Sequence, residues 1–383
     1  MKTSDSNRPT RAEIDLGVLV SNFNNIKEFI GDDTRLMAVV KADAYGHGAV
    51  DCAWALERAG IDWFGVAIPS EGVELRRSGI RKRILCLGSF WKGQVNSLLN
   101  HGLTPVIYRL DQAEAFNKGA RKRNSIAEIH LKIDTGMGRI GVRPGELDEF
   151  LDKFARFENL HVEGVMTHFA AADDPEAITF TNEQIARFED AIKAIEAREH
   201  RPVYKDLANS PATVAYPAAR ANLVRLGGLL YGLTGDVLPP DVDIPDLRPV
   251  MSVRTRIAHL KTVEEGEPLG YGRTFVTGRR SRIATLPIGY QDGYSRVLSN
   301  RSSVLIKGAL APVVGRVSMD WTLVDVTDID GVEVGDEVIL IGENSGVSVS
   351  AEDLAAFSDT ISYEITCGIN RRVTRVYVDS SEE

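Results

Sequence analysis

The chain has few cysteines, no long apolar run and no excess of positive charge. Its three cysteines, Cys52, Cys86 and Cys367, lie far apart in 383 residues. This spacing excludes a disulfide framework and the closely spaced ligands of a zinc site. We therefore expect free cysteines in the core and no metal ion.

The absence of a long apolar run also bears on the cellular compartment in which we expect the protein. No run approaches the roughly 20 residues that a membrane-spanning helix needs. The first eleven residues are polar and lack the apolar core of a secretory signal. We therefore expect a cytoplasmic protein with no membrane partner.

The charge, the composition and the length of the chain indicate its partners and its number of domains. Asp and Glu number 54 against 45 Lys and Arg, a net charge of −9, which argues against nucleic acid as a partner. Hydrophobic residues make up 43% of the chain, as is typical of a folded globular protein. A length of 383 residues favours two domains over one.

Eight short apolar runs alternate with helical patterns in the first part of the chain. Continuous apolar strands of this kind are typical of parallel strands covered by helices. Eight βα units in little over 200 residues match the size of a (β/α)8 TIM-type barrel, which we predict for residues 13–243. An open doubly wound sheet is the alternative, but no G-x-G-x-x-G fingerprint follows the first strand. The expected strands are 36–40, 63–67, 84–87, 104–107, 127–133, 162–167, 203–207 and 223–226.

The pattern changes after a linker at residues 236–249, which holds four prolines. Short β-type runs broken by glycine turns follow it, with one helical segment at 351–357. We predict a mostly antiparallel β domain over residues 244–383. Its expected strands are 250–263, 281–287, 303–306, 311–317, 321–326 and 337–341.

Lys41 stands directly after the first apolar run and before a turn-prone segment. A lysine at the end of a buried strand is desolvated, which lowers its pKa and makes the amine nucleophilic toward an aldehyde. Taken alone, the segment fits a surface lysine equally well.

Polar residues also follow the other barrel strands, at the end where TIM-barrel active sites lie. The loops after strands seven and eight usually bind phosphate in this fold, and here they carry a hydroxyl and glycines, whose N–H groups can approach an anion closely. A lysine facing a phosphate site suggests pyridoxal 5′-phosphate. The residues concerned are Tyr45, Lys132, Asp134, Arg139, His168, Asn209, Ser210, Arg225, Gly227 and Gly228.

Residues 38–48, AVVKADAYGHG, closely resemble the cofactor-lysine signature of the alanine racemases. The resemblance extends over nearly the whole chain, through blocks in the order of that family. It implies an N-terminal barrel and a C-terminal β domain that the first dozen residues join. It also implies a head-to-tail homodimer whose active sites each combine the barrel of one subunit with the β domain of the other. The further blocks are at 12–16, 132–139, 167–170, 208–210, 270–274, 287–290, 315–320 and 361–364.

The resemblance implies two catalytic bases. Lys41 would hold the cofactor covalently and act as one base, and Tyr271 of the partner subunit would act as the other. Racemisation removes a proton from one face of Cα and delivers another to the opposite face, which two opposed bases achieve directly. A tyrosine pKa near 10 must be lowered for this role, and the resemblance assigns His168 and Arg225 to that task.

The resemblance also places Arg225 at the pyridine nitrogen of the cofactor. Arginine only donates hydrogen bonds, so the nitrogen must stay unprotonated to accept one. The ring is then a weak electron sink, which favours simple reprotonation over transamination. Arg139 and the backbone N–H of Met319 would bind the substrate carboxylate. Lys132 matches a position that is often carbamylated, and an unmodified lysine beside Asp134 is the alternative.

The remaining matches concern the phosphate and the entrance. The cofactor contacts would include Tyr45, His168, Asn209, Ser210, Gly227, Gly228 and Tyr363. Glycine at 228 departs from the isoleucine or valine expected there, so local packing should differ. Tyr290 and Met319 would narrow the substrate entrance, with Asp320 in support.

We therefore predict a pyridoxal-phosphate-dependent alanine racemase that supplies D-alanine for peptidoglycan. A related racemase of serine or of broader specificity would share every catalytic residue. A barrel-type decarboxylase would instead place a carboxylate at the ring nitrogen and a cysteine near the substrate. A non-catalytic cofactor-binding barrel would lack the β domain.

Overall fold

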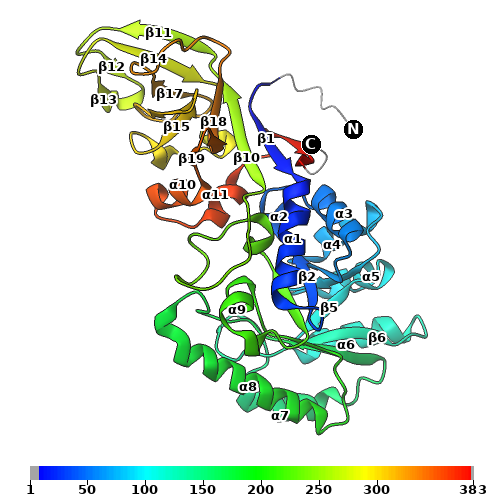
Figure 1. The fold of residues 1–383 in the computed structure, drawn as a ribbon. Helices are drawn as coiled ribbons and strands as arrows, with labels where there is room; N and C mark the ends of the chain where they lie inside the picture. The colour runs from blue at the N-terminus through cyan, green and yellow to red at the C-terminus, as the bar shows by residue number, and fades with distance from the viewer. Residues whose placement is uncertain (1–7, 381–383) are drawn as a thin grey trace.

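The computed structural model describes residues 8–380 and shows a barrel joined to a β domain (Figure 1). Eight parallel strands, β2 to β9, close the barrel. A separate group of sheets, mostly antiparallel, forms the second body above it. The predicted fold class is confirmed.

The barrel strands lie within two residues of their predicted positions. Each pairs in parallel with the next, and β9 closes onto β2. The strands are β2 (Arg35–Val39), β3 (Trp63–Val66), β4 (Arg83–Cys86), β5 (Thr104–Ile107), β6 (Ala127–Lys132), β7 (Leu160–Met166), β8 (Tyr204–Asp206) and β9 (Leu223–Leu226).

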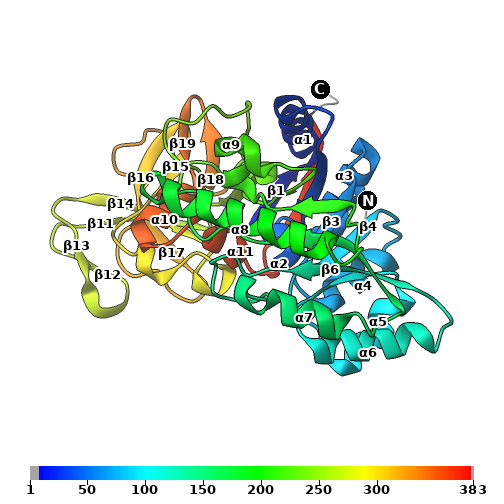
Figure 2. The ribbon, with the colours of Figure 1, turned by 90° about the horizontal axis from the view of Figure 1, so that it is seen from below.

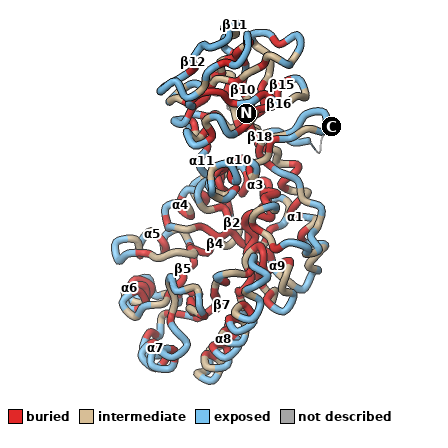
Figure 3. The backbone as a smooth tube through the Cα atoms, turned by 90° about the vertical axis from the view of Figure 1, so that its left-hand side faces the viewer, coloured by how far each residue is buried: buried red, intermediate tan, exposed pale blue. Residues whose placement is uncertain are grey.

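Helices cover the outside of the barrel, and Figure 2 shows them around the strands when the molecule is seen from below. The strands are largely buried, whereas the outer helix faces are exposed (Figure 3). This arrangement explains the continuous apolar composition of the strands. The helices are α1 (Leu16–Ile30), α3 (Ala49–Ala59), α4 (Pro69–Arg77), α5 (Val95–Asn100), α6 (Leu110–Arg121), α7 (Leu147–Phe154), α8 (Ile178–Glu196) and α9 (Ser210–Ala215).

The barrel interior is filled with large side chains. His130 stacks on Tyr204, with ring centroids 5.8 Å apart, and meets the edge of Trp63 at 5.4 Å. Arg83 forms ion pairs with Glu128 and Glu163 at the N-terminal end of the barrel. Burial and the Arg83 charge lower the pKa of His130 to about 3, so this histidine is neutral. Because this end is packed, the C-terminal ends of the strands are left to form a site.

The largest sheet of the β domain runs in the order β16-β15-β18-β10-β1-β20, with β19 paired to β18. Its strands are β1 (Arg11–Asp15), β10 (Met251–Arg256), β15 (Ser303–Ile306), β16 (Ala309–Pro312), β18 (Glu337–Asn344), β19 (Val347–Val349) and β20 (Thr374–Val378). Strand β20 pairs with β1 in parallel, and the other ladders of this sheet are antiparallel. Two short helices, α10 (Ala351–Ser358) and α11 (Ser362–Gly368), precede β20.

Two of the strands predicted for the β domain are wrong. A second sheet runs in the order β11-β14-β17. The single strand expected at 250–263 is two strands, because the chain leaves the first sheet after β10 and joins the second as β11. The strand expected at 311–317 is also displaced, to β16. These elements are β11 (His259–Val263), β14 (Ser281–Leu286) and β17 (Thr322–Asp325), with a small ribbon of β12 (Pro268–Leu269) and β13 (Phe275–Val276).

The first residues that the structure describes lie in the β domain. Strand β1 pairs with β10 and β20, so the predicted boundary at residue 13 falls inside a β-domain strand. Arg8 also forms an ion pair with Asp292, at 2.6 Å. Residues 1–7 lie outside the described part of the chain. The association of those residues with the β domain and the division at residue 244 stay predictions.

The cysteines are only partly as expected. Cys52 and Cys86 are buried, but Cys367 is exposed, so its predicted place in the core is wrong. Cys367 lies in α11, whose buried side chains include Ile365 and Thr366. No helix in residues 8–380 is long and apolar enough to span a bilayer.

Candidate active site

A cavity of about 200 Å³ opens at the C-terminal ends of the barrel strands. Among the described residues, four basic side chains line it and no carboxylate does, so it is suited to an anionic ligand. The structure brings ten of the predicted residues to this cavity: Lys41, Tyr45, Lys132, Arg139, His168, Asn209, Ser210, Arg225, Gly227 and Tyr363.

The loop after Lys41 has an unusual backbone. Residues 42–45 all have positive φ, between 52° and 55°, although none is glycine. A left-handed residue with a side chain costs roughly 1–2 kcal/mol, and such strain persists only where surrounding contacts impose it. The N–H of Ala44 donates to the carbonyl of Val40 at 3.0 Å, which holds the turn closed against β2.

Glu71 at the start of α4 fixes this loop from outside. Its Oε1 accepts a hydrogen bond from the N–H of Ala42 at 2.8 Å. Its Oε2 accepts from the N–H groups of Ala67 at 2.7 Å and Ile68 at 3.2 Å. One carboxylate therefore ties the lysine loop to the neighbouring strand and helix. Sequence reasoning missed Glu71, because the N-cap of α4 is Ile68, which lacks the side-chain oxygen that marks a capping box in a sequence.

Lys41 is electrostatically prepared for nucleophilic chemistry. Burial lowers the pKa of its amine, and the charge of Arg139 lowers it further. Its Nζ lies 5.7 Å from the ring centroid of Tyr45. A lysine with a lowered pKa is more often neutral and can attack an aldehyde.

Arg225 is buried and crosslinks the ends of three strands. Its Nη2 donates to the carbonyls of Thr167 at 3.0 Å and Leu207 at 2.9 Å. The same nitrogen lies 3.2 Å from His168 Nδ1. Because arginine only donates, Nδ1 is the acceptor and the imidazole proton resides on Nε2. Burial and the Arg225 charge lower the pKa of His168 to about 2, so this imidazole is neutral.

Asp206, the last residue of β8, forms a buried ion pair with Nη1 of Arg225. Sequence reasoning missed this residue as well. The signal was a carboxylate inside the apolar run at 203–208, because a charge there needs a partner.

The loops after β8 and β9 form a cup lined by hydroxyl groups. The N–H of Gly227 donates to Ser210 Oγ at 2.9 Å. A Cβ at Gly227 would lie 2.7 Å from Tyr45 Oη, and one at Gly228 would lie 2.4 Å from Tyr363 Oη. Glycine at 228 therefore leaves room for Tyr363 in this chain.

The hydroxyl groups of the cup remain donors. Burial raises the pKa of Tyr363 to about 12 and raises that of Tyr45 as well. Both phenols therefore stay protonated and can donate to an anion. Asn209 supports the cup from below, where its Oδ1 accepts from the N–H of Ala212 at 3.2 Å and caps α9.

Lys132 and Arg139 face the same cavity. Lys132 is buried, and its burial together with the Arg225 charge lowers the pKa of its amine well below the ordinary value. Asp134, its expected neighbour, instead accepts from the N–H groups of Gly136 and Gly138. Among the residues described, none forms a hydrogen bond or ion pair with the Arg139 guanidinium, so it is available to an anion.

Four predicted site residues of the β domain, Tyr271, Tyr290, Met319 and Asp320, do not line this cavity within one chain, whereas Tyr363 does. Tyr271 is 71% exposed, Met319 50% and Tyr290 40%. Tyr290 and Met319 lie on neighbouring turns, since the N–H of Tyr290 donates to the carbonyl of Ser318 at 3.0 Å. Asp320 is turned to Arg372, with which it pairs at 2.8 Å. One chain therefore supplies two separate parts of the predicted site.

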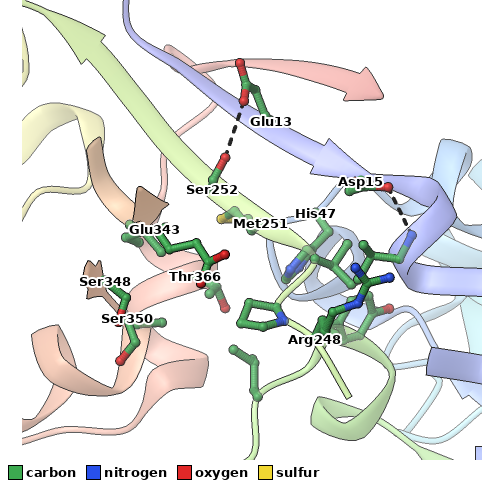
Figure 4. Close-up of a pocket in the computed structure, with 18 of the residues that line it drawn as sticks. Glu13, Asp15, His47, Arg248, Met251, Ser252, Glu343, Ser348, Ser350 and Thr366 are labelled. Carbon is green, nitrogen blue, oxygen red and sulfur yellow. Dashed lines mark hydrogen bonds between the residues drawn. The ribbon is translucent and has the colours of Figure 1, made fainter. Parts of the chain in front are cut away.

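A larger cavity, of about 440 Å³, lies between the barrel and the β domain (Figure 4). Two of its acidic side chains are already engaged: Glu13 pairs with Arg254 at 2.8 Å, and Asp15 caps α1. It offers no lysine. The smaller cavity is therefore the candidate active site.

The strained loop generates a prediction about Glu71. The substitution Glu71→Gln should lower the free energy of unfolding by about 1–3 kcal/mol, because three backbone N–H groups lose a charged acceptor. Hydrogen exchange of residues 41–48 should accelerate. The exposed Glu74 on the same helix gives the matched control, and Glu74→Gln should change neither measurement. Unaltered exchange in Glu71→Gln would contradict this role.

Comparison with known proteins agrees with this geometry. Residues 14–235 match the family described as alanine racemase, N-terminal domain, and residues 250–377 match alanine racemase, C-terminal domain. An alanine racemase of Halothermothrix orenii is 46% identical over 373 residues, 97% of each chain.

Two solved structures are similar throughout. The alanine racemase of Bacillus anthracis with bound L-Ala-P is 35% identical with a TM-score of 0.92, over 98% of this chain and 97% of that one. The alanine racemase of Bartonella henselae with covalently bound pyridoxal phosphate is 30% identical with a TM-score of 0.87, over 97% and 99%. With both family domains matched in order, this chain belongs to the alanine racemase family.

Proposed function

We propose that this chain interconverts L- and D-alanine with pyridoxal 5′-phosphate held at Lys41, as its family does. The observation that carries the proposal is the single cavity that joins Lys41, Arg225 and the hydroxyl-lined cup. Racemisation makes the chain an isomerase. We place it in the cytoplasm, where it would supply D-alanine for peptidoglycan.

The cavity fits this cofactor chemically. The amine of Lys41 suits an aldehyde, and the donors around Ser210 and Gly227 suit a phosphate. Arg225 suits a ring nitrogen that accepts a hydrogen bond. No carboxylate lines the cavity to repel the phosphate. When bound, the cofactor withdraws electrons from Cα and so acidifies its proton.

The residues of the chain then orient the substrate and move its protons. Arg139, which has no partner among the described residues, would bind the substrate carboxylate together with the N–H of Met319. Lys41 would act as base on one face of Cα and Tyr271 on the other. His168, with its proton on Nε2, can donate to the Tyr271 oxygen and support its ionised form.

A second copy of the chain is required to bring Tyr271 to this cavity. Tyr271, Tyr290 and Met319 lie exposed on the β domain, whereas the cavity lies in the barrel. We therefore propose a head-to-tail homodimer in which each β domain completes the partner's site.

The decarboxylase alternative is weakened by the cavity. It requires a carboxylate at the ring nitrogen, and the cavity lining among the described residues includes Arg225 but no Asp or Glu. The decarboxylase also requires a cysteine near the substrate. Cys367 is a counterpart, because it lies beside the lysine loop: a Cβ at Gly46 would lie 3.4 Å from the Cα of Cys367. One of its two requirements is therefore missing.

The activity is tested with purified protein and a panel of alanine, serine and lysine. We expect alanine to be racemised fastest, together with a visible absorbance of the bound cofactor. The substitution Lys41→Ala should remove both the absorbance band and the activity. Faster turnover of serine would instead support the broader racemase, and an active Lys41→Ala protein would refute the cofactor assignment.

The shared site is tested by mixing two inactive variants. Homodimers of Lys41→Ala or of Tyr271→Phe have no intact site. In a head-to-tail heterodimer, Lys41 of one subunit meets Tyr271 of the other, so one of its two sites is intact. Unfolding and refolding the two variants together should restore about a quarter of wild-type activity. No gain over the separate variants would refute a site shared between subunits.

The state of Lys132 is a further proposal. A buried neutral amine can attack the carbon of CO2 and release a proton, which leaves a carbamate anion. Its charge would face the unpaired guanidinium of Arg139. With ¹³C-labelled bicarbonate, we expect one carbamate signal per chain in NMR spectra, lost in Lys132→Ala. A wild-type spectrum without this signal would establish the unmodified lysine.

A further inference from the structure

Asp206 lies behind the cavity rather than in its lining, and it is fully buried. Its Oδ1 accepts from Nη1 of Arg225, while its Oδ2 has no hydrogen-bond partner among the described residues. The other charged side chain that interacts with it is Lys132. A buried carboxylate with this environment is costly unless it compensates a charge.

The hydrogen bonds of Arg225 show what Asp206 achieves. The two terminal nitrogens carry four hydrogens and face five acceptors. Nη1 donates to Asp206 Oδ1 and to the Asp206 carbonyl at 3.3 Å. Nη2 has the carbonyls of Thr167 and Leu207 and His168 Nδ1. Among the described residues none accepts a hydrogen bond from the Nε–H of Arg225, so this donor remains uncommitted.

The charge balance around the cavity is a second reason why Arg225 needs Asp206. Lys41, Lys132, Arg139 and Arg225 line the cavity without a carboxylate among them. Arg225 is only 3% exposed, so water cannot compensate its charge. Asp206 compensates it from the side away from the ligand. The guanidinium can then present one hydrogen bond in a fixed direction.

We propose that Asp206 is a positioning residue that holds Arg225 with its Nε–H turned toward the pyridine nitrogen of the cofactor. This inference rests on the proposed function, in which Arg225 meets that nitrogen. It assigns to Asp206 a role that acts through Arg225, without contact to substrate or cofactor.

The role is tested by binding, without reference to turnover. Dissociation constants are measured by absorbance for pyridoxal 5′-phosphate and for an analogue in which carbon replaces the pyridine nitrogen. We expect the wild type to prefer the natural cofactor by roughly tenfold or more, the size of a hydrogen bond from a charged donor. In Asp206→Asn the preference should fall to within about twofold, since Nη1 of Arg225 loses its charged acceptor and the guanidinium loses its compensating charge. Effects common to both ligands, such as altered net charge, cancel in this ratio.

Glu163 provides the matched control. It is also a buried carboxylate paired with an arginine, Arg83, but at the other end of the barrel. The substitution Glu163→Gln should lower thermal stability, as Asp206→Asn also should, yet keep the wild-type preference. A wild-type preference retained in Asp206→Asn would overturn the positioning role and leave only a structural one. A wild type with no preference would overturn the placement of Arg225 itself, and this inference with it.

Discussion

The buried ion pair between Arg225 and Asp206 is the interaction on which the candidate site depends. Arg225 belongs to β9 and Asp206 ends β8, while the carbonyl of Thr167 follows β7. One guanidinium therefore fixes the ends of three adjacent strands beneath the cavity. The same contacts set the tautomer of His168 and keep that imidazole neutral. Packing, charge and proton placement are thus decided by a single buried pair.

The lysine loop shows a second constraint of the same kind. Four left-handed residues in succession would not persist in an isolated peptide, since each carries a steric cost. They persist here because the loop is closed by backbone hydrogen bonds and held by Glu71. The strained backbone follows directly after Lys41, where desolvation also lowers the pKa of the amine. Desolvation at Lys41 and strain in the next four residues are therefore adjacent in the chain, and both are stabilised by the rest of the barrel.

The division of the site between two bodies gives the molecule its expected assembly. The barrel supplies a cation-lined cavity, and the β domain carries Tyr271 on an exposed turn. Because opposed bases must approach Cα from two sides, a second chain is a natural source of the second base. The barrel cavity and the Tyr271 turn of the β domain would then act on the two opposite faces of Cα.

The sequence by itself determined the barrel, its eight strands and most of the residues around the cavity. Apolar runs of strand length indicate strands buried on both faces of the sheet. Polar residues after these runs indicate the end of the barrel where the active site lies. The tertiary structure decided what depends on contacts distant in sequence. Strand β10 pairs with β1, which is far away in the chain, and the chain then passes to a second sheet as β11. Glu71 and Asp206 appear ordinary until the fold brings Ala42 and Arg225 against them. The role of a carboxylate depends on the group that it contacts, and these contacts form only in the folded chain.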